Sequence, residues 1–260
     1  MTNPGSRSDI FDLSGKVALV CGATRGIGEA IATTLAAYGA RVIVTGRKIE
    51  SCEAVADKIR AAGGMAEARA CHIGELSNIN GLFEWIESTY AQLDILVNNA
   101  AINPYLGPII DTDPAVFQKT MDVNVRGHFY SSANAVRLMS KQHKGSIINV
   151  ASVNGVMPGH HQGIYSISKA ALISMTLAFA KESAAAGVRV NALLPGPTET
   201  RLSSALIHSE EAARTLLPRL PLGRVAQPDE MTGAVLYLAS DAASFTTGAC
   251  LTVDGGFLLS

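Results

Sequence analysis

The feature that most constrains the fold of this chain is an alternation of short, β-branched apolar segments with longer Ala-rich segments. Short segments that are apolar throughout are typical of strands buried on both faces of a parallel sheet. Because parallel strands need right-handed crossovers, the pattern predicts an α/β fold with a doubly wound parallel sheet in three α/β/α layers. The expected strands are 17–21, 41–45, 66–73, 94–98, 146–150, 188–194 and 249–253, and the expected helices are 26–39, 49–63, 77–90, 114–143, 165–186 and 229–240.

Composition limits the domain count and the classes of partner. A chain of 260 residues, 48 % hydrophobic, fits one domain, expected over 11–260 after a flexible tail of residues 1–10. A net charge of −1 argues against a nucleic-acid or anionic-membrane partner. The N-terminus lacks the apolar core of a signal peptide, and no apolar run approaches the roughly 18 residues that span a bilayer. Four Cys without paired spacing favour free thiols and a cytoplasmic location.

A glycine-rich turn, Gly22-Ala-Thr-Arg-Gly-Ile-Gly28, follows the first expected strand. Its spacing arises by chance roughly 0.2 times in such a chain, so its place between a strand and a helix gives it most of its weight. Doubly wound sheets bind ligands beyond the carboxyl ends of their strands. Gly22 suits a tight turn, and Gly26 and Gly28 leave room for a pyrophosphate at the helix N-terminus. The alternative is a plain strand-to-helix turn.

The end of the second strand indicates the type of dinucleotide. NAD sites usually place Asp or Glu there to bind the ribose hydroxyls, whereas this strand runs into Gly46-Arg47-Lys48. Arg47, helped by Lys48 and by Arg25 of the glycine turn, is suited to pair with a 2′-phosphate. We therefore predict NADP(H), with NAD(H) as the less favoured cofactor. The alternative is that Arg47 and Lys48 only solvate a strand end.

Three side chains have the chemistry for proton transfer. Ser152 follows the strand 146–150, and Tyr165 and Lys169 lie four apart, on one face of the expected helix. A Tyr and Lys at this spacing occur by chance roughly 0.2 times here, so the pair alone proves little. The alternatives are a helix cap for Ser152, a core edge for Tyr165 and a solvated charge for Lys169.

With these residues in place, the sequence from Leu13 to about Phe257 resembles the short-chain dehydrogenase/reductase family. CGATRGIG resembles the family motif T-G-x-x-x-G-x-G, with Cys21 for Thr. NNAA (98–101) resembles the family's N-N-A-G, and NVRG (124–127) and YSISK (165–169) resemble its catalytic segments. PGPTET (195–200) resembles P-G-x-I-x-T, and VDGG (253–256) resembles the common C-terminal ending. The resemblance implies a single Rossmann-fold domain with a substrate flap near 197–222.

The resemblance also implies catalytic roles for Asn124, Ser152, Tyr165 and Lys169. Ser152 would hold the reacting oxygen, Tyr165 would transfer the proton, and Asn124 would hold a relay water. Lys169 would lower the pKa of Tyr165, which is about 10 in a free Tyr, and bind the nicotinamide ribose. The implied cofactor residues are Gly22, Thr24, Arg25, Gly26, Ile27, Gly28, Arg47, His72, Ile73, Asn99, Ala100, Tyr165, Lys169, Pro195, Gly196, Thr198 and Thr200, with His72 standing where the family often has an adenine-binding Asp.

The expected substrate residues are Ser152, Asn154, Met157, His161, Tyr165, Leu202 and Leu206. No metal site is expected, because the pair His160-His161 lacks a spaced third ligand. These inferences predict an NADP(H)-dependent carbonyl reductase or alcohol dehydrogenase acting on a ketone or secondary alcohol, with 3-oxoacyl thioesters as the first substrates to test. The alternatives are an NAD-linked polyol or steroid dehydrogenase, or a non-catalytic cofactor-binding regulatory protein. By resemblance, the chain assembles as a homodimer or homotetramer.

Overall fold

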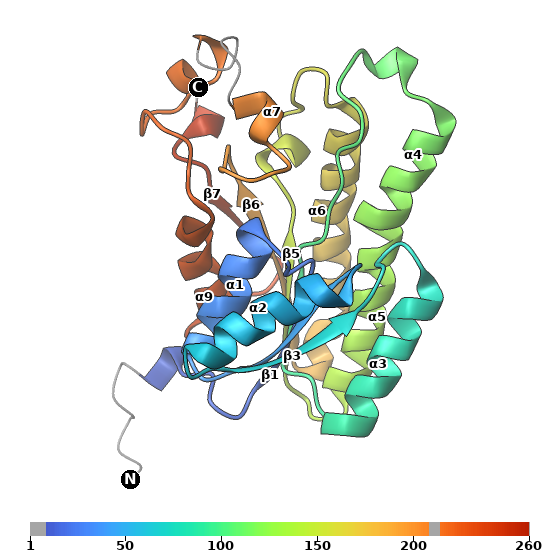
Figure 1. The fold of residues 1–260 in the computed structure, drawn as a ribbon, viewed down its shortest axis with the longest axis vertical. Helices are drawn as coiled ribbons and strands as arrows, with labels where there is room; N and C mark the ends of the chain where they lie inside the picture. Colours follow the sequence, from blue (N-terminus) through green and yellow to red (C-terminus); the bar gives the residue numbers. More distant parts are fainter. Residues whose placement is uncertain (1–8, 208–213, 260) are drawn as a thin grey trace.

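The protein is built on one sheet of seven parallel strands, ordered β3-β2-β1-β4-β5-β6-β7 (Figure 1). The structure is a computed structural model that describes residues 9–207 and 214–259. The strands are β1 Val17–Cys21, β2 Arg41–Gly46, β3 Met65–Ala70, β4 Ile95–Asn98, β5 Gly145–Val150, β6 Val188–Pro195 and β7 Cys250–Val253. The helices are α1 Gly26–Ala37, α2 Ile49–Ala61, α3 Leu76–Tyr90, α4 Pro114–Met121, α5 Gly127–Ser140, α6 Gly163–Ser183, α7 Ser204–Ile207 and α9 Thr232–Ala239.

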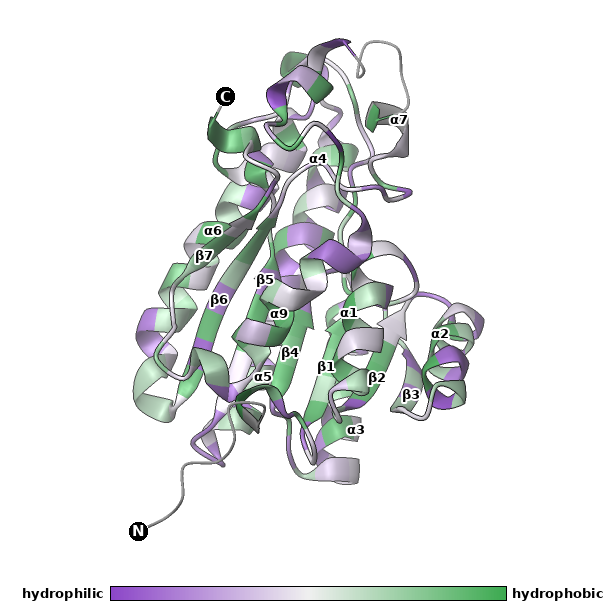
Figure 2. Cartoon of the chain, turned by 90° about the vertical axis from the view of Figure 1, so that its left-hand side faces the viewer, coloured by the Kyte–Doolittle hydropathy of each residue, from purple (hydrophilic) through white to green (hydrophobic). Residues whose placement is uncertain are grey.

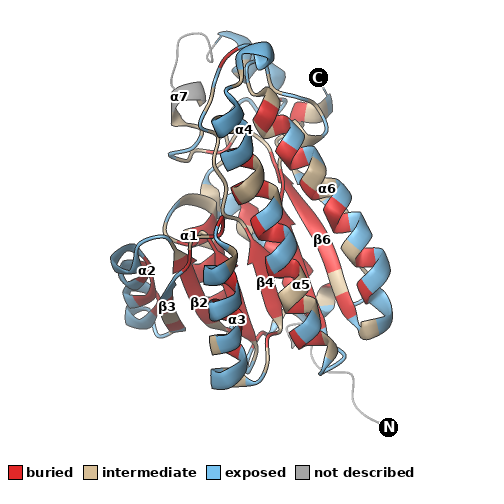
Figure 3. Ribbon diagram, turned by 90° about the vertical axis from the view of Figure 1, so that its right-hand side faces the viewer, coloured by how far each residue is buried: buried red, intermediate tan, exposed pale blue. Residues whose placement is uncertain are grey.

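Helices pack on both faces of the sheet, which confirms the predicted doubly wound α/β fold. Helices α1, α2 and α9 share one apolar core with the sheet (Figure 2), and α3, α5 and α6 share a second core with its other face (Figure 3). Within β1, Val20 belongs to the first core and Leu19 to the second, and neither side chain is exposed. The strands are apolar throughout because each face of the sheet is covered.

The strand register brings distant chain segments to one edge of the sheet. Cys21, the last residue of β1, pairs with Thr45 of β2 and with Asn98 of β4. Asn98 in turn pairs with Asn149 of β5. The segments that leave these strands therefore emerge side by side at the carboxyl edge.

Several element boundaries differ from the predicted ones. The expected helix 114–143 is interrupted by a π-helical turn, Asp122–Arg126, which separates α4 from α5. The third strand ends at Ala70 rather than at 73. The expected tail 1–10 lies mostly outside the described residues, but Asp9 and Ile10 belong to a short 3₁₀ helix.

The segment Gly163–Ala186, which contains α6, is long and apolar enough to cross a membrane by length and composition alone. In this fold Leu172 and Met175 pack against Ala192 and Leu194 of β6. The place of α6 in the core therefore accounts for part of its apolar character, while Ile167 and Leu177 are exposed.

Candidate active site

A cavity of about 690 Å³ lies where the carboxyl ends of β4, β5 and β6 meet α6 and the segment after β6. It is bordered by the residues following those strands, which is where doubly wound sheets bind ligands. The predicted residues that line it are Ile27, Asn99, Ser152, Asn154, His161, Tyr165, Lys169, Pro195, Gly196, Thr198, Thr200 and Leu202.

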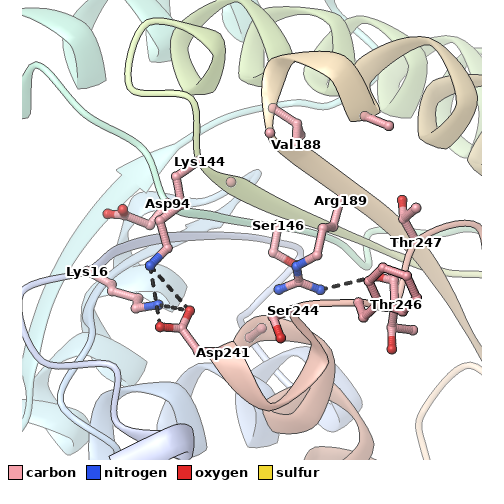
Figure 4. A pocket seen from close by; sticks show the side chains of 15 residues that line it. Lys16, Asp94, Lys144, Ser146, Val188, Arg189, Asp241, Ser244, Thr246 and Thr247 are labelled. Carbon is pink, nitrogen blue, oxygen red and sulfur yellow. Dashed lines mark hydrogen bonds and ion pairs between the residues drawn. The ribbon is translucent and has the colours of Figure 1, made fainter. Parts of the chain in front are cut away.

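A second cavity of similar volume opens at the opposite edge of the sheet (Figure 4). There, Lys16 and Lys144 both pair with Asp241, at 3.2 and 3.3 Å, and Arg189 donates to the carbonyl of Thr246 at 3.4 Å. Its cations are thus already engaged within the protein. The two cavities have similar volumes, so volume does not show which of them binds a ligand. The position of the first cavity at the carboxyl edge of the sheet and the chemistry of its lining residues favour it as the ligand site.

The glycine turn after β1 is shaped by contacts with the loop after β4. Gly22 has a φ of 78°, and a Cβ on it would lie 2.7 Å from Ala100 Cα. A Cβ on Gly28 would lie 2.2 Å from the carbonyl oxygen of Gly22, which also accepts a 2.8 Å hydrogen bond from Asn99 Nδ2. The space at Gly28 is therefore filled by the protein itself, contrary to the expectation that it leaves room for a pyrophosphate.

Gly26 has the open position in this turn. Its φ is 55°, and a Cβ built on it would meet only the Thr200 side chain, at 3.4 Å. Gly26 is also the first residue of α1, where backbone N–H groups and the helix dipole attract anions. The turn thus fits a pyrophosphate at Gly26, between α1 and the segment that contains Thr200.

Tyr165 and Lys169 lie in the first two turns of α6. Lys169 is 1 % exposed, and its Nζ donates to the carbonyl of Val150 at 2.8 Å and lies 5.5 Å from the centre of the Tyr165 ring. Burial lowers the pKa of Lys169 to about 7. Burial also raises the pKa of Tyr165 to about 12, although a hydrogen bond with Ser152 acts in the opposite direction. The expected lowering of the Tyr165 pKa by Lys169 is therefore not found, because desolvation dominates at both groups.

Ser152 combines a structural contact with its place in the cavity. It caps the short 3₁₀ helix Val153–Gly155, and its Oγ accepts a hydrogen bond from the backbone N–H of Asn154 at 3.1 Å. The same side chain lines the cavity beside Tyr165. The helix-cap interpretation of Ser152 is therefore confirmed, and its place in the cavity is compatible with the predicted role in the site.

Asn124 lies in the π-helical turn and is completely buried. Its Oδ1 accepts from Ile102 N at 2.9 Å, and its Nδ2 donates to Ile102 O at 2.9 Å and to Ser168 Oγ at 3.1 Å. Both amide hydrogens are used within the protein, so the side chain is not available to donate to the relay water that was expected there. Asn124 instead fixes the loop after β4 against α6.

The predicted phosphate-binding cations are exposed. Arg25, Arg47 and Lys48 are all on the surface, and Arg25 directly precedes α1. The acidic residues nearby pair elsewhere, since Lys58 binds Glu29 and Arg60 binds Glu53 and Asp57. Within the described ranges, Arg25 and Arg47 thus have no acidic partner, which suits an anionic ligand.

Besides Asn124, Arg47, Ala100 and every predicted residue of the glycine turn except Ile27, four more predicted residues lie outside the cavity lining or outside the description. His72 Nδ1 accepts from Gly74 N at 3.1 Å, so its ring closes a local turn, and the Ile73 side chain belongs to the core. Met157 packs on a separate apolar cluster that includes Phe257. The side chain of Leu206 lies outside the described residues.

Sequence reasoning missed a part of the cavity wall formed by Asn103, Leu106, Gln162 and Phe257, whereas Leu216 and Arg219, which also line it, belong to the expected flap 197–222. Asn103 and Leu106 follow β4, so the rule that ligands bind beyond strand ends identifies them if it is applied past the NNAA segment. Gln162 directly precedes α6. Nothing in the sequence indicated that Phe257, near the C-terminus, reaches this cavity. Within the described ranges, no group of three or more His, Cys, Asp or Glu could hold a metal ion.

Comparison with known proteins gives extensive matches. The family model described as "Enoyl-(Acyl carrier protein) reductase" matches residues 22–258. A 3-oxoacyl-[acyl-carrier-protein] reductase of Aquifex aeolicus is 41 % identical, over 94 % of this chain and 98 % of its own. The dehydrogenase/reductase SDR family member 4 of Oryctolagus cuniculus is 35 % identical over 94 % of both chains. A gluconate 5-dehydrogenase of Burkholderia cenocepacia, solved with NADP and tartrate, superimposes with a TM-score of 0.93 at 33 % identity, covering 97 % of this chain and 98 % of that one.

Proposed function

Since the chain belongs to the short-chain dehydrogenase/reductase family, we propose that it is an NADP(H)-dependent oxidoreductase that interconverts a ketone and a secondary alcohol. The observation that carries the proposal is the meeting of Ser152, Tyr165 and Lys169 in one cavity at the carboxyl edge of the sheet. A regulatory protein that only binds a cofactor has no need for these three side chains together.

The proposed mechanism assigns one task to each of these side chains. When bound, the nicotinamide supplies or accepts the hydride. Ser152 donates a hydrogen bond to the substrate oxygen, where negative charge develops during reduction. Tyr165 delivers its phenolic proton to that oxygen, or removes the proton in the reverse direction. Lys169, whose Nζ donates to Val150 O, would bind the nicotinamide ribose when the cofactor is present.

The preference for NADP(H) over NAD(H) rests on charge. Arg25 and Arg47 offer two exposed guanidinium groups, and no acidic residue ends β2. A guanidinium binds phosphate through two parallel hydrogen bonds, whereas a carboxylate there would repel it. The gluconate 5-dehydrogenase above was solved with NADP, which supports the same choice.

The test follows nicotinamide absorbance while the protein is offered NADPH with a panel of ketones and 3-oxoacyl thioesters. We expect turnover, and we expect Tyr165→Phe to lower kcat by about 100-fold or more, because it removes only the transferable proton. Tyr38→Phe, at an exposed position after α1, is the matched control. Undiminished activity of Tyr165→Phe would refute the proton-transfer role, and no turnover of any ketone or thioester would refute the enzymatic proposal.

We also propose that the chain forms homodimers or homotetramers through the outer face of α4, α5 and α6. Phe117, Phe129, Tyr130, Ile167 and Leu177 on these helices are each 42–49 % exposed. Clustered exposed apolar side chains of this kind mark protein interfaces. Light scattering after size-exclusion chromatography tests the proposal, and a mass of one chain at micromolar concentration would contradict it.

A cytoplasmic location is proposed from the thiols. Cys21, Cys52 and Cys71 are buried as free thiols, and Cys250 is a free thiol on the edge strand β7. Burial raises the pKa of Cys52 and of Cys71 to about 11, which keeps both protonated and unreactive. Free thiols of this kind persist in a reducing compartment.

A further inference from the structure

We propose that the carboxamides of Asn154 and Gln162 recognise a hydroxyl group on the carbon beside the reacting carbonyl. The substrate is then an α-hydroxy ketone, and its reduction product is the corresponding vicinal diol. This inference rests on the proposed function, and it names the substrate class of the same cavity.

The two carboxamides are tied directly to the reacting end of the cavity. The backbone N–H of Asn154 donates to Ser152 Oγ at 3.1 Å, and Asn154 Nδ2 donates to Gln162 Oε1 at 3.2 Å. Ser152, Asn154 and Gln162 all line the cavity. In the proposed complex, Ser152 holds the reacting oxygen and the adjacent amide pair binds the substituent on the neighbouring carbon.

The orientation of Gln162 is fixed from two sides. Its Oε1 accepts a second hydrogen bond, from Asn103 Nδ2 at 3.2 Å, so that the loop after β4 and the loop before α6 both hold it. A Cβ on Gly159 would lie 2.7 Å from Gln162 Nε2 and 2.9 Å from Asn154 Nδ2. Both atoms are the far ends of flexible side chains, so a larger residue at 159 would displace the two carboxamides. The arrangement is preorganised before any ligand binds.

Asn154 and Gln162 each keep a polar atom without a partner in this arrangement. Within the described part of the chain, Gln162 Nε2 and Asn154 Oδ1 have no hydrogen-bond partner, and neither is among the fully buried unpaired atoms. A hydroxyl group both accepts and donates hydrogen bonds, so its chemistry matches both kinds of atom, and in the proposal one hydroxyl pairs with both. The thioester carbonyl of a 3-oxoacyl substrate only accepts, and it would leave Asn154 Oδ1 unpaired. The pair therefore favours a hydroxyl-bearing substrate.

The reaction itself balances as an ordinary carbonyl reduction. The carbonyl carbon gains a hydride from NADPH, the carbonyl oxygen gains the Tyr165 proton, and NADP⁺ leaves. The recognised hydroxyl keeps its proton throughout, so Asn154 and Gln162 are specificity-determining residues and take no part in proton transfer.

The test compares kcat/KM for acetoin, which has the hydroxyl, with kcat/KM for butanone, which lacks it. For the wild-type protein we expect acetoin to be favoured by about 10-fold or more, because butanone leaves the two polar atoms unpaired. We expect Gln162→Met, which is close in size and apolar, to lose about 10-fold on acetoin and to stay within about twofold on butanone. We compare the ratio of kcat/KM for acetoin to kcat/KM for butanone in the variant with the same ratio in the wild type. The intrinsic reactivity of each ketone is the same with both proteins, so it cancels in this comparison.

Gln118→Met is the matched control, because Gln118 is exposed on α4 and bonds to Asp122. It should leave both rates unchanged. Equal treatment of acetoin and butanone by the wild type would overturn the inference, and so would an equal loss on both ketones in Gln162→Met. Turnover of acetoacetyl-CoA without turnover of acetoin would overturn this inference alone. No turnover of any of these compounds would overturn the proposed function as well. If Gln162→Met does not fold, the wild-type comparison decides.

Discussion

Replacing Asn124 by alanine tests whether its side chain holds the loop after β4 against α6. The change removes the hydrogen bonds that both backbone groups of Ile102 make, at 2.9 Å each, and one bond to Ser168. A buried polar group left without a partner costs about 1–3 kcal/mol. Because Ile102 is only partly buried, water recovers part of this loss. We therefore expect the free energy of unfolding to fall by about 2–4 kcal/mol.

Urea titration measures this change directly. The midpoint should fall while the slope stays constant, because the surface exposed on unfolding is unchanged. In calorimetry, a loss of this size lowers Tm by roughly 4–16 °C for a chain of this length. The kcat should fall too, since Ile102 lies in the loop that borders the cavity.

Asn134→Ala is the control for this experiment. Asn134 lies on α5, and its side chain makes hydrogen bonds with Asn80 and Arg137, both in exposed positions. Its loss should cost less than about 1 kcal/mol, because water replaces both partners. If Asn124→Ala and Asn134→Ala have the same stability, the positioning role of Asn124 is wrong.

Three further changes test the site and its support. Arg47→Ala should raise the Kd for NADPH about 10-fold or more and leave the Kd for NADH unchanged. A fluorescence titration measures both values, and equal effects on both would show that Arg47 does not bind the 2′-phosphate. Lys169 has its pKa lowered to about 7 in the folded protein, so between about pH 7 and 10 the unfolded chain binds more protons and stability rises with pH. Lys169→Met should lower the dependence of the free energy of unfolding on pH by up to about 1.4 kcal/mol per pH unit in this range. Denaturant titrations at several pH values measure this dependence, and an unchanged dependence would contradict the burial of an uncharged amine. Gly28→Ala should destabilise the fold by about 1–3 kcal/mol, because the new methyl would lie 2.2 Å from Gly22 O. Gly81→Ala, in α3, is the control: a methyl there would meet no atom within 4 Å, so the change should be neutral or stabilising by up to about 1 kcal/mol.

The layers and the strand positions were predictable because burial on both faces leaves a plain signal in the sequence. Leu19 and Val20 point into different cores, and both positions are apolar for that reason. The break between α4 and α5 was not predictable, since Asp122–Arg126 contains neither Pro nor Gly. That turn contains Asn124, whose bonds to Ile102 and Ser168 join segments about 20 and 40 residues away, and local periodicity does not report such contacts.

The site was predictable to the extent that its residues follow strand ends. Ser152 and Thr200 were found in this way, and so was the glycine turn. The pKa values of Tyr165 and Lys169 were not, because they depend on how deeply α6 is buried. His72 was assigned to the adenine by position along the chain, whereas its ring bonds to Gly74 two residues on. Gln162 was missed because its importance depends on Asn103, which is remote in sequence.

The strand order also has a consequence for synthesis on the ribosome. Strand β1 lies between β2 and β4, yet β4 begins only at Ile95, well after β3 has ended at Ala70. Until then a nascent chain presents one edge of β1 unpaired, and every residue of that strand is buried in the finished protein. Apolar edges of this kind recruit other strands, so a chain stalled before residue 95 is a target for aggregation or for a chaperone. Completion of the cavity has to wait longer still, until Phe257 near the C-terminus has emerged.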